Sequence, residues 1–398
     1  MAKKGGLMVK EKIAQAIEIL KEKQVDVWLT FVRESHSMAD PCMSLIVGAH
    51  CTWESAFIIT AGGESIAIVG NLDGPAFRDS GNFNEVITFK TGIGDSLRRM
   101  FKRLDPQTIA LNFSKNDYMS DGLTYGMYQL LLDYLKYTPY RKRFISSESI
   151  VSAVRGRKSP TEVERIKAAC SLTLEIFDGV TRFAKPGKTE KEIAEFMLNA
   201  VEEQGVGLSW DRATCPSVFT GPDTAGAHYG PTDRKIERGH IMNIDFGVKL
   251  NDYVSDLQRT WYFLRDGEQY APAEVVKAFE TVRNAIRLSA DFLKPGVMGY
   301  EVDKVARGYI VSQGFEEYPH ALGHQVGRQA HDGAGILCPE WDRYKNLPYL
   351  KVEPGQVYTI EPRVTCEGYG VATMEEIVVV TDHGVEFLSD PQEELICI

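Results

Sequence analysis

Two segments of this 398-residue chain are similar at a constant offset of 109 residues. The first begins at Lys185 and reads KPGKTEKEIAEFMLNAVEEQG; the second begins at Lys294 and reads KPGVMGYEVDKVARGYIVSQG. Both start with KPG, carry a glutamate at the eighth position and end in QG. Similarity at one fixed spacing indicates an internal repeat, although so few matches also allow chance. We therefore expect a duplicated half-domain, each copy a helical segment followed by strands.

The part of the chain before the repeat alternates between helix-like and strand-like patterns. A chain of this length can bury more than one hydrophobic core, so two domains are expected. The amphipathic or apolar segments here are residues 10–23, 25–32, 56–60, 65–70, 106–113 and 126–136. Their alternation predicts a mixed α/β domain over residues 1–150.

Two helix-start signals mark the entry to a second domain, residues 151–398. Ser159 followed by Glu162 forms a capping box, in which each residue satisfies a free backbone N–H of the first helical turn. Thr189 and Glu192 repeat this pattern inside the first copy of the repeat. The sequence therefore predicts two successive helices at the start of the second domain.

The composition excludes several classes of function. The chain carries 45 basic and 55 acidic residues, a formal net charge of −10, which argues against a nucleic-acid partner. Its seven cysteines are scattered and form no CxxC pair, so we interpret them as reduced packing residues. No apolar run approaches membrane-spanning length, and the charged start MAKKGGLMVKEK lacks a signal-peptide core. We expect a cytoplasmic protein with no membrane partner.

Two aspartates, Asp245 and Asp256, lie in the strongly apolar stretch NIDFGVKLNDYVSDLQRTW. A buried carboxylate needs a counter-charge, a hydrogen bond or a metal ion, because burying it alone is costly. A chain reversal midway between Leu250 and Asn251 would place the two aspartates directly opposite each other on one face of a hairpin.

A second hairpin is predicted in VYTIEPRVTCEGYGVATMEEIVVVT, where Glu361 and Glu375 lie at equal distances from Gly368. Like charges that face each other destabilise a sheet unless a cation lies between them. Four carboxylates on two related hairpins therefore predict a site for multivalent cations. The alternative is that each acid faces solvent on an edge strand.

Histidines gather in the same part of the chain. His320, His324 and His331 lie within YPHALGHQVGRQAHDGAG, and His228 lies in GPDTAGAHYGPTDR just before the first hairpin. A single histidine in a polar loop is usually a surface residue. Three within twelve positions, beside two acidic hairpins, favour a shared site.

These motifs resemble those of the pita-bread metallopeptidases, namely aminopeptidase P, prolidase and methionine aminopeptidase, with creatinase as a metal-free relative. The chain carries DFG, SDLQRT, GH, EP and EE…VVVT in the order of that family. The resemblance implies an α/β (α+β) fold class, with an amino-terminal creatinase-type mixed α/β domain and a carboxy-terminal, pseudo-symmetric pita-bread domain. It implies a metal-ligand set of Asp245, Asp256, His324, Glu361 and Glu375.

The resemblance also implies that this set holds two divalent ions. Asp256 and Glu375 would bridge the ions. Asp245 would complete the coordination of one ion, and His324 with Glu361 would complete the coordination of the other. Four carboxylates and one imidazole, without a thiolate, suit Mn²⁺ or Co²⁺, with Fe²⁺ and Zn²⁺ as alternatives.

The catalytic roles follow from the same resemblance. A hydroxide shared by the two ions would be the nucleophile, and Glu361 would carry its proton to the leaving amine. His228 and His331 would contact the scissile amide and its developing oxyanion, and His320 would help to position the substrate.

The expected function is that of a hydrolase, a metal-dependent Xaa-Pro aminopeptidase or dipeptidase that cleaves the amino-terminal bond of short peptides. The family often forms homodimers, and we expect one here. Proline-specific members usually carry an arginine two residues before the last metal-binding glutamate, where this chain has Thr373. The DPCMSLIVGAH stretch also departs from the family pattern. We therefore expect proline to be tolerated after the scissile bond without being strictly required.

Two other classes of function stay open. Relatives with this fold include creatinase, ectoine hydrolase and a metal-dependent lyase of dimethylsulfoniopropionate, so a small-molecule hydrolase or lyase is the main alternative. Creatinase lacks the metal ligands, and the intact ligand set argues against a close copy of it. The remaining class is a binding module on an inactive scaffold, but such proteins usually lose ligands.

Overall fold

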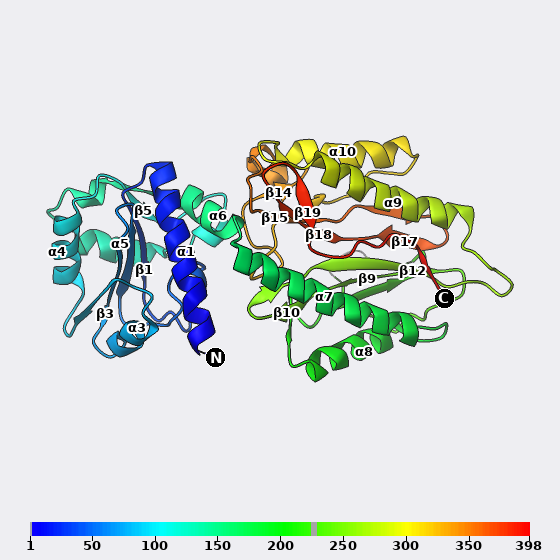
Figure 1. The fold of residues 1–398 in the computed structure, drawn as a ribbon, viewed down its shortest axis with the longest axis horizontal. Helices are drawn as coiled ribbons and strands as arrows, with labels where there is room; N and C mark the ends of the chain where they lie inside the picture. The colour runs from blue at the N-terminus through cyan, green and yellow to red at the C-terminus, as the bar shows by residue number, and fades with distance from the viewer. Residues whose placement is uncertain (1, 224–228) are drawn as a thin grey trace. The chain divides into compact units, whose positions relative to one another are not determined.

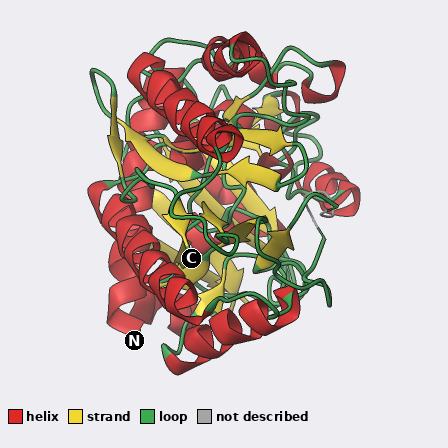
Figure 2. Cartoon of the chain, turned by 90° about the vertical axis from the view of Figure 1, so that its right-hand side faces the viewer, coloured by secondary structure: helices red, strands yellow, loops and turns green. Residues whose placement is uncertain are grey.

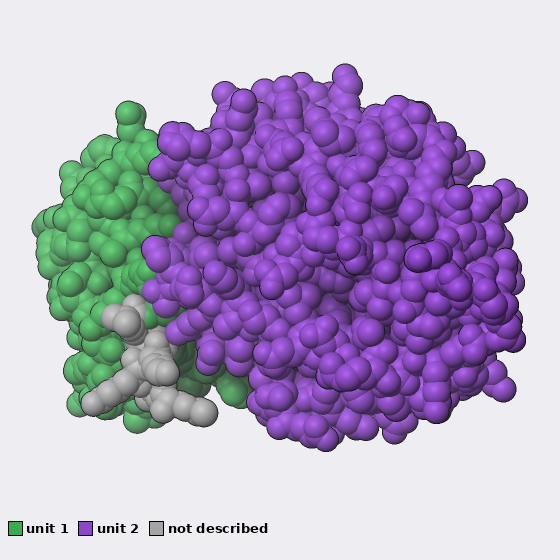
Figure 3. All heavy atoms as spheres, turned by 45° about the vertical axis from the view of Figure 1, so that its right-hand side comes forward, with its two compact units in different colours: residues 1–155 green, residues 156–398 purple. Residues whose placement is uncertain are grey.

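Two units make up the chain, residues 1–155 and 156–398 (Figure 3). The structure, a computed structural model, describes residues 2–223 and 229–398. The units divide five residues after the boundary that the sequence predicts. No helix in these described ranges has both the length and the apolar character needed to cross a membrane.

The first unit is built on a six-stranded sheet with the strand order β4-β3-β2-β1-β5-β6. The β1–β2 and β2–β3 pairs are antiparallel, and the other three pairs are parallel. The strands are β1 (Val27–Val32), β2 (Ser55–Thr60), β3 (Ser65–Gly70), β4 (Glu85–Phe89), β5 (Ile109–Leu111) and β6 (Phe144–Ser146). The helices are α1 (Ala2–Lys23), α2 (Met43–Ile46), α3 (Gly74–Ser80), α4 (Gly94–Leu104), α5 (Tyr125–Tyr134) and α6 (Glu148–Gly156), with 3₁₀ turns η1 (Tyr118–Ser120) and η2 (Tyr140–Lys142).

Helices cover both faces of this sheet. Alternate residues of β1 enter two different cores: Trp28 packs with Leu20 of α1, whereas Leu29 packs with Leu97 of α4 and Leu131 of α5. A strand covered on both faces reads as a continuous apolar run, and all six residues of β1 are buried. The mixed α/β architecture expected from the sequence is confirmed.

The second unit carries two helix pairs on a layer of strands. The helices are α7 (Pro160–Phe183), α8 (Glu190–Glu203), α9 (Ala273–Phe292) and α10 (Gly299–Ser312), followed by 3₁₀ turns η3 (Asp342–Tyr344) and η4 (Leu347–Tyr349). Figure 1 shows α7 and α8 on one side of the strands and α9 and α10 on the other, and the strands also lie between helices in Figure 2. The first residues of α8 and α10 are 109 positions apart, and so are the last residues. The repeat in the sequence is therefore also a repeat in the structure.

The strands of the second unit are short and form several small sheets. They are β7 (Gly207–Leu208), β8 (Ser217–Thr220), β9 (Ile241–Phe246), β10 (Val248–Leu250), β11 (Tyr253–Val254), β12 (Leu257–Tyr262), β13 (Gly323–His324), β14 (Ile336–Leu337), β15 (Val357–Ile360), β16 (Arg363–Cys366), β17 (Gly370–Thr373), β18 (Glu376–Val380), β19 (Val385–Phe387) and β20 (Ile396–Cys397).

Both predicted capping boxes are present at the starts of α7 and α8. The Ser159 hydroxyl accepts from the backbone N–H of Glu162, whose carboxylate accepts from the backbone N–H of Ser159 at 2.8 Å. Thr189 and Glu192 form the same pair of bonds. All seven cysteines are free thiols, and only Cys397 is exposed.

The first hairpin has a different register from the predicted one. In the antiparallel β9–β12 pair, Asp245 lies opposite Gln258 and not opposite Asp256. The chain reverses one residue later than expected, at Asn251 and Asp252, which have positive φ values of 51° and 69°. Two successive residues in this conformation form the tight turn that suits the twist of a hairpin. The prediction of directly opposed aspartates is wrong, and Asp256 lies diagonal to Asp245 on the same face.

The second hairpin has the predicted register. Arg363 lies opposite Thr373 in the β16–β17 pair, and the β15–β18 pair continues the same register. Glu361 and Glu375 fall between these two ladders and therefore occupy facing positions. The turn contains Gly368 at a positive φ of 76°. The prediction that the two glutamates face each other across a hairpin is confirmed.

Candidate metal centre and active site

The five predicted ligands come from the ends of strands in both halves of the second unit. Asp245 lies on β9, Asp256 just before β12, His324 on β13, Glu361 just after β15 and Glu375 just before β18. One ligand atom each of Asp256, His324 and Glu375 lie within 4.8 Å of one another. The Nε2 atom of His324 is 3.4 Å from a Glu361 carboxylate oxygen and 3.8 Å from one of Asp256. The hairpins are joined directly, because Gln258 and Glu375 form an antiparallel bridge.

The four carboxylates form one acidic cluster, in which Asp256 and Glu375 are buried and Asp245 and Glu361 are partly buried. Burial raises the pKa of Asp245 to about 7, although a hydrogen bond with Asp256 opposes this shift. Burial also raises the pKa of Asp256 well above its usual range, and the charges of Glu375, Asp245 and Glu361 raise it further. The pKa values of Glu361 and Glu375 are raised by burial and then by neighbouring carboxylates. Within the described parts of the chain, no lysine or arginine forms an ion pair with any of these four carboxylates.

Two oxygens in this cluster lack a hydrogen-bond partner within the described parts of the chain. These atoms are Oδ1 of Asp245 and Oε1 of Glu375, and both are buried. A buried carboxylate oxygen without a donor is costly, and such atoms need an explanation. A divalent cation would satisfy both atoms and offset the like charges. The residues therefore fit a metal centre with mainly oxygen ligands.

His324 is suited to ligation because it is held neutral. Burial and, to a smaller extent, the neighbouring His331 together lower its pKa to about 3. Only the neutral imidazole has a lone pair for a metal. The rings of His324 and His331 meet edge to face with centroids 4.2 Å apart, so His331 lies directly beside the cluster.

His320 lies on the side of the site that carries positive charge. Its Nδ1 atom is 2.7 Å from the Ala321 carbonyl oxygen, which fixes the ring. Burial, together with the charges of Arg363, Arg307 and Arg343, lowers its pKa to about 4. The predicted site residue His228 lies outside the described residues.

Gln258 also belongs to the site, although the sequence pattern does not predict it. Its amide nitrogen donates to Oε2 of Glu375 at 2.9 Å and to Oε2 of Glu361 at 3.3 Å. Its amide oxygen accepts from the Thr373 hydroxyl at 2.9 Å. The available signal was its place two residues after Asp256, which puts both side chains on one face of a strand.

Two buried ion pairs hold the backbone around the site. Arg259 and Glu376 are 3.0 Å apart, and the Arg259 guanidinium also donates to the carbonyl oxygens of Gln258 and Glu375. Lys158 and Asp332 are 3.8 Å apart with both side chains almost fully buried. Since Asp332 follows His331, this second pair restrains the segment that carries that histidine.

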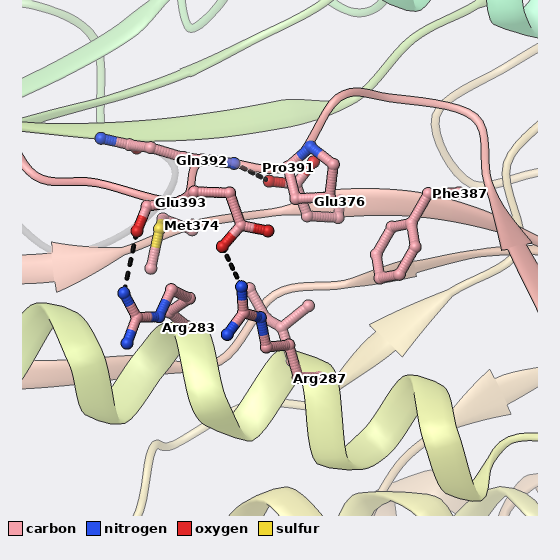
Figure 4. A pocket seen from close by; sticks show the side chains of 9 residues that line it. Arg283, Arg287, Met374, Glu376, Phe387, Pro391, Gln392 and Glu393 are labelled. Carbon is pink, nitrogen blue, oxygen red and sulfur yellow. Dashed lines mark hydrogen bonds and ion pairs between the residues drawn. The ribbon is translucent and has the colours of Figure 1, made fainter.

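A separate hollow lies beside α9 (Figure 4). Met374 and Glu376, which flank Glu375 in the chain, contribute to its wall together with Arg283 and Arg287. None of the five ligands lines it, because side chains alternate between the two faces of a strand. Arg287 forms an ion pair with Glu393 there, as Figure 4 shows, so the hollow is distinct from the carboxylate cluster.

The chain is similar to known peptidases over most of its length. An uncharacterized peptidase of Staphylococcus saprophyticus is 27% identical over 385 residues, covering 95% of this chain and 99% of that protein. An Xaa-Pro dipeptidase of Pyrococcus horikoshii is 28% identical over 297 residues, covering 74% of this chain and 79% of that protein.

Solved structures share the fold over almost the whole chain. An Xaa-Pro dipeptidase from Bacillus anthracis superposes with a TM-score of 0.74 at 23% identity, covering 98% of this chain and all of that one. An X-Pro aminopeptidase from Thermotoga maritima gives 0.71 at 23% identity, covering 97% of this chain and 99% of that one. These neighbours establish the two-domain pita-bread architecture. The family model of the M24 metallopeptidases matches residues 164–382, more than half of the chain, and the protein belongs to metallopeptidase family M24.

Proposed function

We propose that this protein is a metal-dependent peptidase that hydrolyses the amino-terminal peptide bond of short peptides, in the manner of an Xaa-Pro dipeptidase or aminopeptidase. The observation that carries the proposal is the convergence of four carboxylates, two buried and two partly buried, on one neutral imidazole. The unpartnered oxygens of Asp245 and Glu375 support a resident cation. Membership of family M24 and the relative named as an Xaa-Pro dipeptidase support the reaction class.

The proposed ligands are Asp245, Asp256, His324, Glu361 and Glu375, and they would hold two divalent ions. Mn²⁺ or Co²⁺ suits this donor set best, with Fe²⁺ and Zn²⁺ as alternatives. When bound, such ions polarise a carbonyl group and lower the pKa of water, so that it becomes a nucleophile near neutral pH. No serine or cysteine nucleophile is required.

The side chains around the ligands would position the substrate and move its protons. Glu361 is held at Oε2 by Gln258, while one of its oxygens lies 3.4 Å from His324. Glu361 is therefore placed to take a proton from water and deliver it to the leaving amine. His331, beside His324, would donate a hydrogen bond to the oxygen that gains negative charge. His320 would help to position the substrate.

The proposal is tested on the full chain after its metal has been removed with a chelator and Mn²⁺ or Co²⁺ has been added back. The substrates are Leu-Pro, Leu-Pro-Gly and the matched peptides with alanine in place of proline. We expect release of the amino-terminal leucine only in the presence of metal, with proline tolerated but not required. If the ions bind and no peptide is cleaved, the peptidase proposal fails, and the small-molecule hydrolase or lyase becomes the better account.

A further inference from the structure

Arg363 lies at the edge of the carboxylate cluster and is neither a proposed metal ligand nor a proposed proton carrier. It begins β16, two residues after Glu361, and lies directly opposite Thr373. Side chains two apart on a strand share a face, so Arg363 and Thr373 lie on the same face as Glu361 and Glu375. The hydrogen bond from Thr373 to Gln258, which also bonds both glutamates, shows that this face is turned toward the site.

Arg363 lies near His320. Three arginines lie close enough to His320 to lower its pKa. Two of them are engaged elsewhere: Arg307 forms an ion pair with Asp303 at 2.8 Å, and Arg343 donates to the Pro319 carbonyl oxygen at 2.7 Å. The third is Arg363.

The Arg363 guanidinium forms no hydrogen bond or ion pair with any residue in the described ranges 2–223 and 229–398. The side chain is half-buried. Its five N–H donors are therefore removed from part of their water without a protein acceptor in exchange. Although four carboxylates belong to the same site, none is paired with it. A cation held in this way is available to an anionic group of a ligand.

We propose that Arg363 binds the free carboxylate at the carboxy terminus of the substrate and so makes the enzyme prefer dipeptides to longer peptides and amides. This inference rests on the proposed peptidase function. A planar guanidinium binds a carboxylate through two parallel hydrogen bonds, which gives both affinity and orientation. Thr373 cannot supply such a charge, but the residue that faces it across the strand pair can. In this strand pair the positive charge is therefore on β16, at Arg363, and not on β17, where Thr373 stands.

The test compares substrates that differ only in this carboxylate. With Mn²⁺ present, kcat and KM are measured for Leu-Pro and its amide Leu-Pro-NH₂, and for Leu-Ala and Leu-Ala-NH₂. Wild-type protein should favour the free acids. Arg363→Ala should raise KM for the acids by about 10- to 100-fold, the usual range for a charge-assisted bond, and should leave kcat/KM for the amides within about twofold. Arg363→Lys should recover part of the loss.

Arg238→Ala is the matched control, because Arg238 is a half-exposed arginine of the same unit whose ion pair is with Asp266. It should leave all four substrates unchanged. Circular dichroism and metal content establish that each variant is folded and loaded. An equal loss on acids and amides in folded, loaded Arg363→Ala would overturn the inference, as would wild-type protein that does not distinguish the two.

A binding measurement separates this inference from the proposed function. Titration calorimetry with L-proline and with L-prolinamide needs no cleavage. Binding of L-proline that is lost in Arg363→Ala but kept in Arg238→Ala supports the carboxylate site even if no peptide is hydrolysed. Equal binding of L-proline by wild type and Arg363→Ala, or no binding by either, contradicts it even if peptides are hydrolysed.

Discussion

The Thr373 hydroxyl donates a hydrogen bond of 2.9 Å to the amide oxygen of Gln258, and this bond determines which end of the amide faces the glutamates. With its oxygen occupied, Gln258 directs its nitrogen at Glu375 and Glu361. The proline-specific enzymes that the sequence resembles usually have an arginine where Thr373 stands. Here a neutral amide, oriented by a threonine, donates to the two acids instead.

Replacing Thr373 by valine should lower kcat/KM for Leu-Ala by about 2- to 10-fold, because one hydrogen bond that orients Gln258 is lost while the shape is kept. Thr373→Ser retains the hydroxyl and is the control. Steady-state kinetics with saturating Mn²⁺ measures both. A loss in the serine variant as large as that in the valine variant would show that the methyl group, and not the hydrogen bond, is what matters.

Removal of the Gln258 amide should weaken metal binding. Gln258→Ala leaves Oε2 of Glu361 and of Glu375 without their shared donor, and losing a group that orients ligands typically costs about 10- to 100-fold in metal affinity. Calorimetric titration of the metal-free protein with Mn²⁺ measures the change. Gln204→Ala, an exposed glutamine at the end of α8, is the control and should bind as wild type does. Unchanged affinity in Gln258→Ala would remove it from the site.

The register of the two hairpins shows what the sequence can and cannot supply. Glu361 and Glu375 were placed correctly because Gly368 marks the turn and the strands on either side of it are regular. Asp245 was paired with the wrong residue because Asn251 and Asp252 both adopt left-handed conformations. The midpoint of a polar stretch does not reveal that choice, and a shift of one residue in the turn changes every pair.

The parts of the site that the sequence did not predict are those that depend on contacts between the two halves. Gln258 has no charge and no metal-binding chemistry of its own, so its only local signal is its position two residues after Asp256 on the same face of the strand. Its partners Glu361 and Thr373 lie more than 100 positions away. The repeat and the capping boxes were predictable because their physical causes are local: a helix start needs acceptors within three residues.

The metal-free protein should become less stable as the pH rises through neutrality. The pKa of Asp245 is raised to about 7 in the folded state, well above its value in the unfolded chain. Between about pH 4 and pH 7 the folded state therefore binds more protons than the unfolded state does. The free energy of unfolding is higher at low pH and is lowered as the pH rises to 7. Thermal unfolding with EDTA at pH 5, 6, 7 and 8 should show this loss, and Asp245→Asn should reduce it. If the unfolding temperature of Asp245→Asn depends on pH as strongly as that of the wild type, Asp245 is not the group responsible. Excess Mn²⁺ should restore stability at high pH in wild type, since binding to the folded state stabilises it.

The two neighbouring histidines should separate binding from turnover. His331→Ala should keep its metal and lose turnover by about 10²- to 10³-fold, as expected when a donor to the oxyanion is removed. His324→Ala should bind metal more weakly, because it removes a ligand. Elemental analysis and kinetics on the same samples distinguish the two effects. Normal rates in both metal-loaded variants would show that these roles are wrong.

The central claim is that cleavage depends on ions held between the two acidic hairpins, and titration of activity with Mn²⁺ tests it most directly. Metal-free wild-type protein should be inactive on Leu-Pro and Leu-Ala, and activity should rise to a plateau at two equivalents of Mn²⁺ per chain. Asp256→Ala, which removes a proposed bridging carboxylate, should bind little metal and stay inactive throughout the titration. The claim would be contradicted by cleavage in the rigorously metal-free protein, or by an Asp256→Ala variant that recovers wild-type activity at the same two equivalents.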